Sequence, residues 1–376
     1  MRSLSRSSLK RGTQMPSQPS NRDLRNLLLR DYRPRTQLTL PEHHVSAARF
    51  PAIDMHNHLG KWLTSFIGDG REWTAPDVGE LVGLMDSCNI AGIVNLDGRW
   101  GQELLENLNR YDNAYPGQFA TFCHVDWNEL RVPGFGHRLA ASLRRSVECG
   151  AKGLKVWKDL GLKVRDGSGD LVLPDDPRLE ELWIMAGELG VPVAIHTADP
   201  RAFFDPVDEE NEFLELLLTA PEWSYAGADT PSFERLITAF EKLVLRHPGT
   251  TFVGLHVGCH AEDLGRLDRL LQKAPNLYID IAARLYQLGR QPRAARSLIE
   301  KYPRRFMFAT DHFPPARRAY ELYFRFLETE DEYFPYSSNP KNSGRWNISG
   351  LGLSEKILES FYQQNAIRIL PSLTVQ

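Results

Sequence analysis

The stretch IDMHNHLG, residues 53–60, places two histidines one residue apart, directly after an apolar run and before a glycine. If the run is a β-strand, His56 and His58 point to the same face, because side chains alternate along a strand with a period of two. Asp54 is expected on that face as well. Two imidazoles at the end of a strand can bind one metal ion, but a single pair is weak evidence. The interpretation therefore depends on whether the rest of the chain supplies further ligands.

Seven more apolar runs follow the first, and longer amphipathic stretches separate them. The eight runs, rich in Val, Ile, Leu and Phe, cover residues 50–56, 90–97, 119–127, 151–158, 191–197, 250–258, 276–282 and 305–311. The stretches expected to be helices cover residues 77–89, 101–112, 136–149, 178–189, 232–247, 261–274, 291–302 and 316–328. Buried strands joined by helices run parallel, and eight of them close a barrel. We therefore predict an α/β protein with a (β/α)8 TIM barrel, and an open doubly wound sheet is the alternative.

Two insertions interrupt this alternation, at residues 198–231 and 329–352. They carry the aromatic residues Phe203, Phe204, Trp223, Tyr225, Tyr333, Phe334, Tyr336 and Trp346. Such loops can close over a site, seal a contact between subunits of a homo-oligomer, or simply pack over the barrel. A final helix at about residues 354–369 is expected to pack on the outside.

The N-terminal residues 1–36 are rich in Arg and Ser and contain three prolines. Few apolar and many charged residues predict a disordered basic tail, with the true start at Met15. The alternative is a targeting segment, because an Arg-rich and acid-poor start resembles a transit peptide. Residues 37–376 are then expected to form a single barrel domain.

The composition excludes several classes of protein. The chain has a net charge of −3, 42% hydrophobic residues and 25% charged residues, so it offers no basic surface for nucleic acid. No apolar run is long enough to cross a bilayer. The four cysteines form no CxxC pair, which favours reduced thiols in a cytoplasmic protein over a zinc knuckle or disulfides. The partner that remains is a small molecule.

Polar side chains gather at the carboxyl ends of the predicted strands, where a (β/α)8 barrel carries its active site. They are His56, His58, Asp97, Arg99, His124, Asp126, Lys155, His196, His256, Asp280, Arg284 and Asp311. Five of the 11 histidines are in this set. Burying so much polarity in one place is costly unless the groups share a partner, and a divalent cation is such a partner.

This order of residues, D-x-H-x-H followed by Lys, His, His and Asp at strands one, four, five, six and eight, resembles the amidohydrolase superfamily. Within it, the chain is similar to the amidohydrolase-2 branch, which includes metal-dependent hydrolases and the aminocarboxymuconate-semialdehyde decarboxylase group. The resemblance covers roughly residues 50–370. It implies that His56, His58, His196 and Asp311 hold one divalent metal. It also implies that His256 handles protons or polarises the substrate.

Three imidazoles and one carboxylate suit Zn²⁺, with Mn²⁺ or Fe²⁺ as alternatives. Such a cation lowers the pKa of a bound water from ~15.7 toward ~7. Asp311 can take the proton as the water attacks and later pass it to the leaving group, while His256 stabilises the oxyanion or donates a proton. Asp311 and His256 are therefore the predicted catalytic residues.

Lys155 has two interpretations. In some members of the superfamily the strand-four lysine is carbamylated and bridges two metals, whereas one metal is usual in the branch that this chain resembles. Because side chains alternate along a strand, Lys155 is expected on the same face as Trp157. An unmodified Lys155, together with Arg99 and Arg284, would favour a substrate that carries a carboxylate. We predict that the substrate is bound by Lys155, Arg99, Arg284 and Trp157. Alternatively, the lysine and the two arginines pair with the aspartates at the strand ends.

The predicted function is that of a metal-dependent hydrolase, which uses an activated water on a lactone, amide or related carbonyl bond of a small carboxylic-acid derivative. The alternative is a metal-dependent, non-oxidative decarboxylase with the same ligands, which needs a proton donor for the carbanion. A non-catalytic barrel would be expected to have lost ligands, and none of the matched positions is lost.

Overall fold

The computed structural model describes residues 24–28, 31–32, 34–63, 72–227, 229–337 and 346–375. Two compact units make up the chain, Met1–Leu40 and Pro41–Gln376. The first contains a short 3₁₀ helix, η1 (Leu24–Asn26). Most of the predicted tail, including Met15, lies outside the described residues, as does part of the second insertion.

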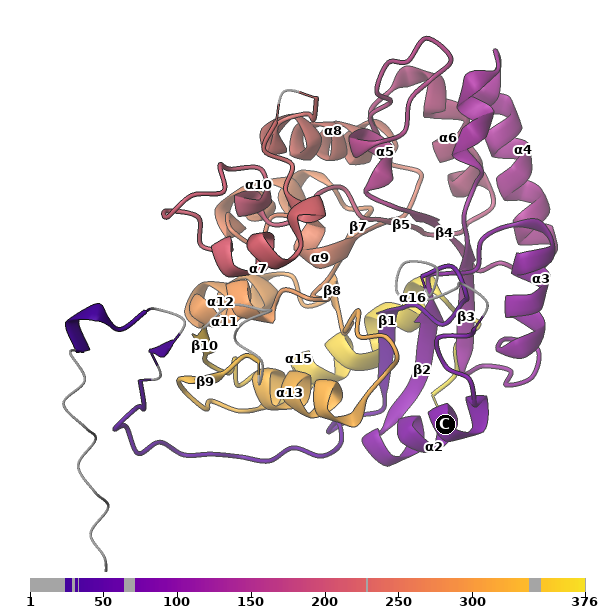
Figure 1. Ribbon diagram of the computed structural model, residues 1–376. Helices are drawn as coiled ribbons and strands as arrows, with labels where there is room; N and C mark the ends of the chain where they lie inside the picture. Colours follow the sequence, from indigo (N-terminus) through magenta and orange to yellow (C-terminus); the bar gives the residue numbers. More distant parts are fainter. Residues whose placement is uncertain are drawn as a thin grey trace, which may run out of the picture. The chain divides into compact units, whose positions relative to one another are not determined.

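Within the described residues of the second unit, eight strands form one parallel sheet in the order β1 to β8 (Figure 1). They are β1 (Ala52–Asn57), β2 (Ile90–Asn95), β3 (Phe119–Cys123), β4 (Gly153–Val156), β5 (Val193–Ile195), β6 (Phe252–Gly254), β7 (Leu277–Asp280) and β8 (Phe306–Met307). The first and last strands meet, because the Met55 N–H donates to the Phe308 carbonyl (3.0 Å) and the Asp311 N–H to the His56 carbonyl (2.8 Å). The predicted (β/α)8 barrel is confirmed, and the open sheet is wrong.

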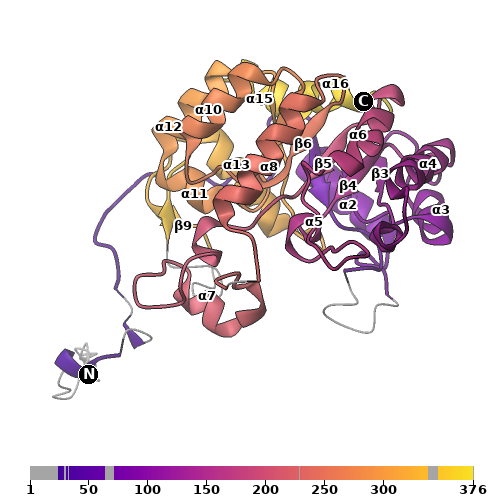
Figure 2. The same cartoon turned by 90° about the horizontal axis from the view of Figure 1, so that it is seen from above.

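Helices follow the strands at all the predicted places and surround the sheet (Figure 2). They are α2 (Val78–Cys88), α3 (Gly101–Arg110), α4 (Phe135–Glu148), α6 (Glu180–Glu188), α8 (Phe233–Arg246), α10 (Leu264–Lys273), α12 (Pro292–Lys301) and α13 (Arg317–Glu328). Local sequence explains where some of them begin. The side chains of Asp77 and Ser232 accept backbone N–H groups in the first turns of α2 and α8, as N-caps do. No helix of the described part has the length and apolar character of a membrane span.

The strands bury both faces, which explains why the runs read as continuously apolar. Residues such as Leu154 and Ile279 pack between the sheet and the helices. Residues such as Ile53, Val94 and Val253 fill the inside of the barrel.

The C-terminal segment covers the end of the barrel at which β8 begins. It consists of α15 (Glu355–Glu359), the π-helical turn η7 (Ser360–Gln364) and α16 (Asn365–Ile369). Ala366 and Leu370 join the apolar cluster inside the barrel, and the Asn365 side chain donates to the carbonyl of Phe306 (2.8 Å). The expectation that this helix packs on the outside holds for Phe361 and Tyr362, which join the outer apolar cluster. It does not hold for the last part of the segment, because the apolar interior needs a cover at this end.

The two insertions pack against each other. The first contains α7 (Leu214–Thr219), and the described part of the second forms an antiparallel pair, β9 (Phe334–Pro335) with β10 (Asn347–Ile348). Trp346 lies 4.9 Å from Phe213 and stacks on Tyr286 at 5.2 Å. Aromatic packing thus joins the insertions to the residues that follow β7, where α11 (Leu285–Arg290) begins.

Candidate metal centre

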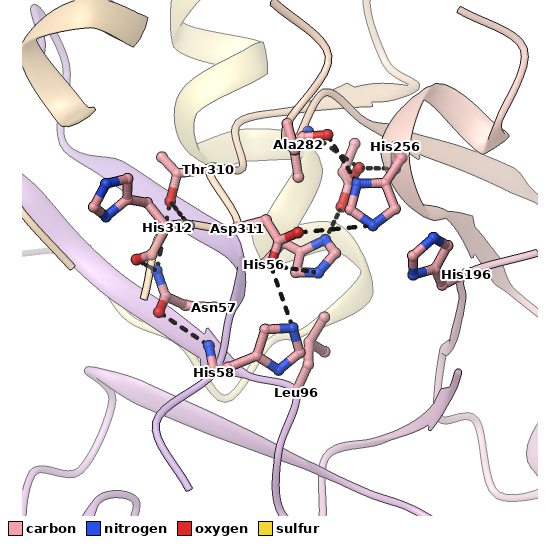
Figure 3. A network of polar contacts seen from close by, with 12 residues as sticks. His56, Asn57, His58, Leu96, His196, His256, Ala282, Thr310, Asp311 and His312 are labelled. Atoms are coloured by element: carbon pink, nitrogen blue, oxygen red, sulfur yellow. Dashed lines mark hydrogen bonds and ion pairs between the residues drawn. The ribbon is translucent and has the colours of Figure 1, made fainter. Parts of the chain in front are cut away.

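His56, His58 and Asp311 meet at the carboxyl ends of β1 and β8 (Figure 3). The Nε2 atoms of His56 and His58 lie 3.5 and 3.4 Å from Oδ1 of Asp311. Atoms bound at ~2.0–2.2 Å around a tetrahedral zinc ion are about 3.3–3.6 Å apart. The spacing of these three groups therefore fits one divalent cation.

An irregularity in β1 aims the two histidines. The pairing of β1 with β2 shifts register between Asp54 and Asn57, and such bulges redirect side chains next to active sites. Asp54 consequently does not share the face of His56 and His58. Its carboxylate accepts instead from the Thr310 N–H (3.0 Å) and the Thr310 hydroxyl (2.7 Å). The expected alternation is wrong here, and Asp54 ties β1 to the residue that precedes Asp311.

Asp280, at the end of β7, orients His56. Its Oδ2 lies 2.8 Å from Nδ1 of His56, and both side chains are buried. With the proton on Nδ1, the imidazole turns its Nε2 lone pair toward Asp311. A carboxylate that holds the far nitrogen of a ligand histidine is the usual outer partner in metal sites.

His256 stands in a strained turn after β6. His256, Val257, Gly258 and Cys259 have φ values of +58°, +62°, +58° and +59°, a conformation that costs non-glycine residues about 1–2 kcal/mol each. The turn is held because the thiol of Cys259 donates to the Ala198 carbonyl (2.7 Å). Strain of this kind is concentrated at functional sites.

The turn presents the His256 ring to the cluster. Nδ1 of His256 lies 2.9 Å from the Ala282 carbonyl, so it carries the proton. Nε2 lies 3.9 Å from Oδ2 of Asp311 and has no hydrogen-bond partner among the described residues. His256 therefore offers a lone pair to whatever occupies the space beside Asp311.

His196, the fourth predicted ligand, is near the cluster but not part of it. Its ring centroid lies 4.2 Å from that of His256, and Figure 3 shows it beside His256, apart from His56, His58 and Asp311. Nε2 of His196 lies 3.5 Å from Oδ1 of Asp199, while Nδ1 is buried without a partner in the described structure. Sequence reasoning missed Asp199, whose only signal is its place three residues after a strand-end histidine.

Burial sets the charges of the site. It lowers the pKa of His58 to about 4 and that of His196 to about 3, so both imidazoles are neutral at neutral pH. Burial raises the pKa of the Asp311 carboxyl group. The interactions with His56, His58 and Lys155 nevertheless hold this pKa below its usual range. Neutral imidazoles around an ionised carboxylate are the donor set that a divalent cation requires.

A cavity of about 400 Å³ opens beside the cluster. Its walls are largely aromatic and come from both insertions and from the strand ends: Trp157, Phe203, Phe213, Trp223, Tyr286, Phe313 and Tyr336. The insertions thus line the site in addition to packing over the barrel. Trp157, a predicted substrate-binding residue, stacks on His58 at 4.9 Å.

Arg284 also lines this cavity. Its side chain is buried and donates to the Ala283 carbonyl (2.8 Å), and no ion pair joins it to a carboxylate within the described ranges. The other cation of the wall, Lys158, is paired with Asp199. Arg284 therefore stands as the predicted anion-binding group of the cavity.

Lys155 and Arg99 are not at this cavity; both line a second one. In the part of the chain that the structure describes, neither they nor Arg284 forms an ion pair with a strand-end aspartate. Arg99 lies near Glu103 instead, with 3.7 Å between Nε and Oε2.

A (β/α)8 barrel with imidazoles and a carboxylate at the carboxyl ends of its strands defines a class of metal-dependent barrel enzymes. The sequence matches the amidohydrolase family model over residues 53–371. The chain belongs to this family, in the amidohydrolase-2 branch. None of the curated proteins matches the sequence.

Solved structures share the fold. A putative amidohydrolase from Staphylococcus aureus is 16% identical, with a TM-score of 0.51 over 85% of this chain and 99% of that one. The 2,6-dihydroxybenzoate decarboxylase from Rhizobium is 14% identical, with a TM-score of 0.54 over 86% and 99%. A dihydroxybenzoic acid decarboxylase from Polaromonas, with bound manganese and 2-nitroresorcinol, is 14% identical, with a TM-score of 0.56 over 87% and 98%. At this identity the likeness establishes the fold alone.

Proposed function

We propose that the protein is a metal-dependent hydrolase that cleaves a carbonyl C–X bond in a small molecule bearing a carboxylate. One observation carries this proposal: the lone pair of His256 Nε2 and the carboxylate of Asp311 face each other at 3.9 Å beside the ligand cluster. Two neighbouring bases suit the removal of a proton from an attacking water.

Each residue of the site has a proposed role. His56, His58 and Asp311 would hold the divalent cation, and His196 would be the fourth ligand. The cation, for which we propose Zn²⁺, supplies Lewis-acid activation of the water and the carbonyl. Asp311 and His256 accept the proton of the water and return it to the leaving group. Arg284 binds the substrate carboxylate, because a buried guanidinium without an ion-pair partner in the described structure favours an anion.

Decarboxylation of a small aromatic acid is the second candidate. The aromatic walls of the cavity favour it, since a planar ring stacks well on such surfaces. Two of the three similar structures named above are decarboxylases of dihydroxybenzoic acids. The structure from Polaromonas holds manganese, which makes Mn²⁺ the second metal to test. A decarboxylase must deliver a proton to carbon, and here His256 or Asp311 would first have to acquire one from the substrate.

One experiment separates the two reactions. The metal-loaded enzyme is offered lactones and amides that carry a carboxylate, and in parallel a panel of hydroxybenzoic and muconate-like acids. We expect acid release from the first set without carbon dioxide. Carbon dioxide from the second set, with no hydrolysis of the first, would replace our proposal by the second candidate. His256→Asn should lose most of the activity that is found, whereas His260→Asn, a buried histidine paired with Glu241, should retain it.

A further inference from the structure

A second cavity, of about 240 Å³, lies next to the first, and Trp157 lines both. Four of the chain's eight tryptophans line it. It also contains two cations, Arg99 and Lys155. The proposed hydrolysis uses neither of them.

The guanidinium of Arg99 is fixed in place. It lies 5.0 Å from the ring of Trp62 and 4.1 Å from that of Trp100, and cation–π contacts hold it there. His124 directs it further, because its Nε2 lies 2.8 Å from the Leu96 carbonyl and its Nδ1 lies 3.3 Å from Nη1 of Arg99. The Arg99 backbone has a φ of +59°. A strained, immobilised arginine is preorganised for a planar, two-oxygen anion.

Lys155 is the second cation. It is 1% exposed, and its Nζ has no hydrogen-bond partner among the residues that the structure describes. Its Nζ lies 4.6 Å from the centroid of the Trp157 ring, a cation–π contact. A buried amine without an acceptor is costly, and an incoming anion would supply the missing acceptor.

The carboxylates around the cavity have other partners. Asp126 accepts from the backbone N–H and the side chain of Asn128 (3.0 and 2.9 Å), and Asp159 pairs with Lys163 at 3.7 Å. Glu103 lies 3.7 Å from Arg99, which is beyond hydrogen-bond distance. Asp311, Asp280 and Asp97 attract Lys155 electrostatically, but Nε of Arg99 and Nζ of Lys155 have no hydrogen-bond acceptor among the described residues.

We propose that the second cavity is a carboxylate-binding site formed by Arg99 and Lys155 against the tryptophan wall. The carboxylate belongs either to a free small acid or to a substrate that reaches past Trp157 from the first cavity; only the second case rests on the proposed function. In that case the substrate is a dicarboxylate.

The test is a titration of the purified full-length protein with acetate, followed by tryptophan fluorescence. We expect saturable binding that weakens at least about tenfold in Arg99→Met and in Lys155→Met, because each removes a charge from a desolvated pair. Glu103→Gln should tighten binding, since it removes the competing carboxylate. Arg131→Met, at an exposed arginine that lines a neighbouring hollow with Trp127, is the matched control and should leave the Kd unchanged.

Absence of an acetate-dependent signal, or equal affinities in wild type, Arg99→Met and Glu103→Gln, would overturn the proposal even if Lys155→Met does not fold. Glutarate distinguishes the two sources. If one molecule spans both cavities, added Zn²⁺ tightens glutarate binding but not acetate binding; if the acid is separate, Zn²⁺ affects neither. Either result would support a carboxylate-binding site at Arg99 and Lys155. No turnover is needed, so failure here leaves the proposed hydrolysis untouched.

Discussion

Nδ1 of His56 and Oδ2 of Asp280 lie 2.8 Å apart in the barrel, and both side chains are buried. This contact fixes which nitrogen of His56 faces Asp311. Asp280 also accepts the backbone N–H of His256 (2.6 Å). One carboxylate thus orients a proposed ligand and a proposed base at the same time.

Replacing this carboxylate should loosen the metal. In Asp280→Asn we expect the affinity for Zn²⁺ to fall about 10–100-fold, because the outer partner of a ligand histidine contributes that much. Competition with a chromophoric chelator measures the affinity. Asp126→Asn, at a strand-end carboxylate outside the cluster, is the control. An unchanged affinity in Asp280→Asn would show that His56 needs no such support.

His256→Asn should separate catalysis from metal binding. We expect this variant to keep its metal, because His256 is not in the ligand cluster, and to lose about 10²–10⁴-fold in kcat, the usual contribution of a general base. Metal content and steady-state rates are measured on the same preparation. Turnover at the wild-type rate would remove His256 from the mechanism.

Arg284→Met should act on substrate recognition. Without the guanidinium, we expect KM for a carboxylate-bearing substrate to rise at least about tenfold, since a charge-assisted bond to a buried group is lost. For a neutral analogue of the substrate, the KM of this variant should be close to that of the wild type. Equal losses on both substrates would instead indicate that Arg284 supports the fold.

Asp97→Asn should change how stability depends on pH. Burial and the nearby charge of Glu103 raise the pKa of Asp97 to about 8, whereas an unfolded aspartate titrates near ~3.9. Between these values the folded state binds more protons, so its stability falls as the pH rises. Urea unfolding should therefore show that Asp97→Asn gains about 2 kcal/mol or more relative to wild type on going from pH 5 to pH 8. A pH-independent difference would contradict the raised pKa.

The barrel could be predicted because its signal is local. Eight apolar runs and the intervening amphipathic stretches specify strands and helices without knowledge of their neighbours, and the polar residues at the strand ends follow from the parallel arrangement. The orientation of the Asp54 side chain could not be predicted from the local sequence. Its direction depends on a register shift against β2 and on bonds to Thr310, which lies far away in the sequence.

The details of the site depend on similar long-range contacts. Nothing in the run 250–258 indicates that the residues from His256 onward adopt a left-handed turn, which is tied by Cys259 to the loop after β5. Nor does any spacing reveal that Arg99 lies between Trp62 and Trp100 in a cavity separate from Arg284. The cations were correctly expected at the strand ends, but their division between two cavities required the structure.

We propose that His56, His58 and Asp311, with His196 beside them, hold one cation. Elemental analysis of the protein after saturation with Zn²⁺ and removal of the excess measures this binding. We predict about one equivalent of Zn²⁺ in the wild type, less than one in His196→Ala with loss of activity, and none in His58→Ala. A wild-type protein that retains no metal, or variants that retain a full equivalent, would show that these residues do not form the metal site.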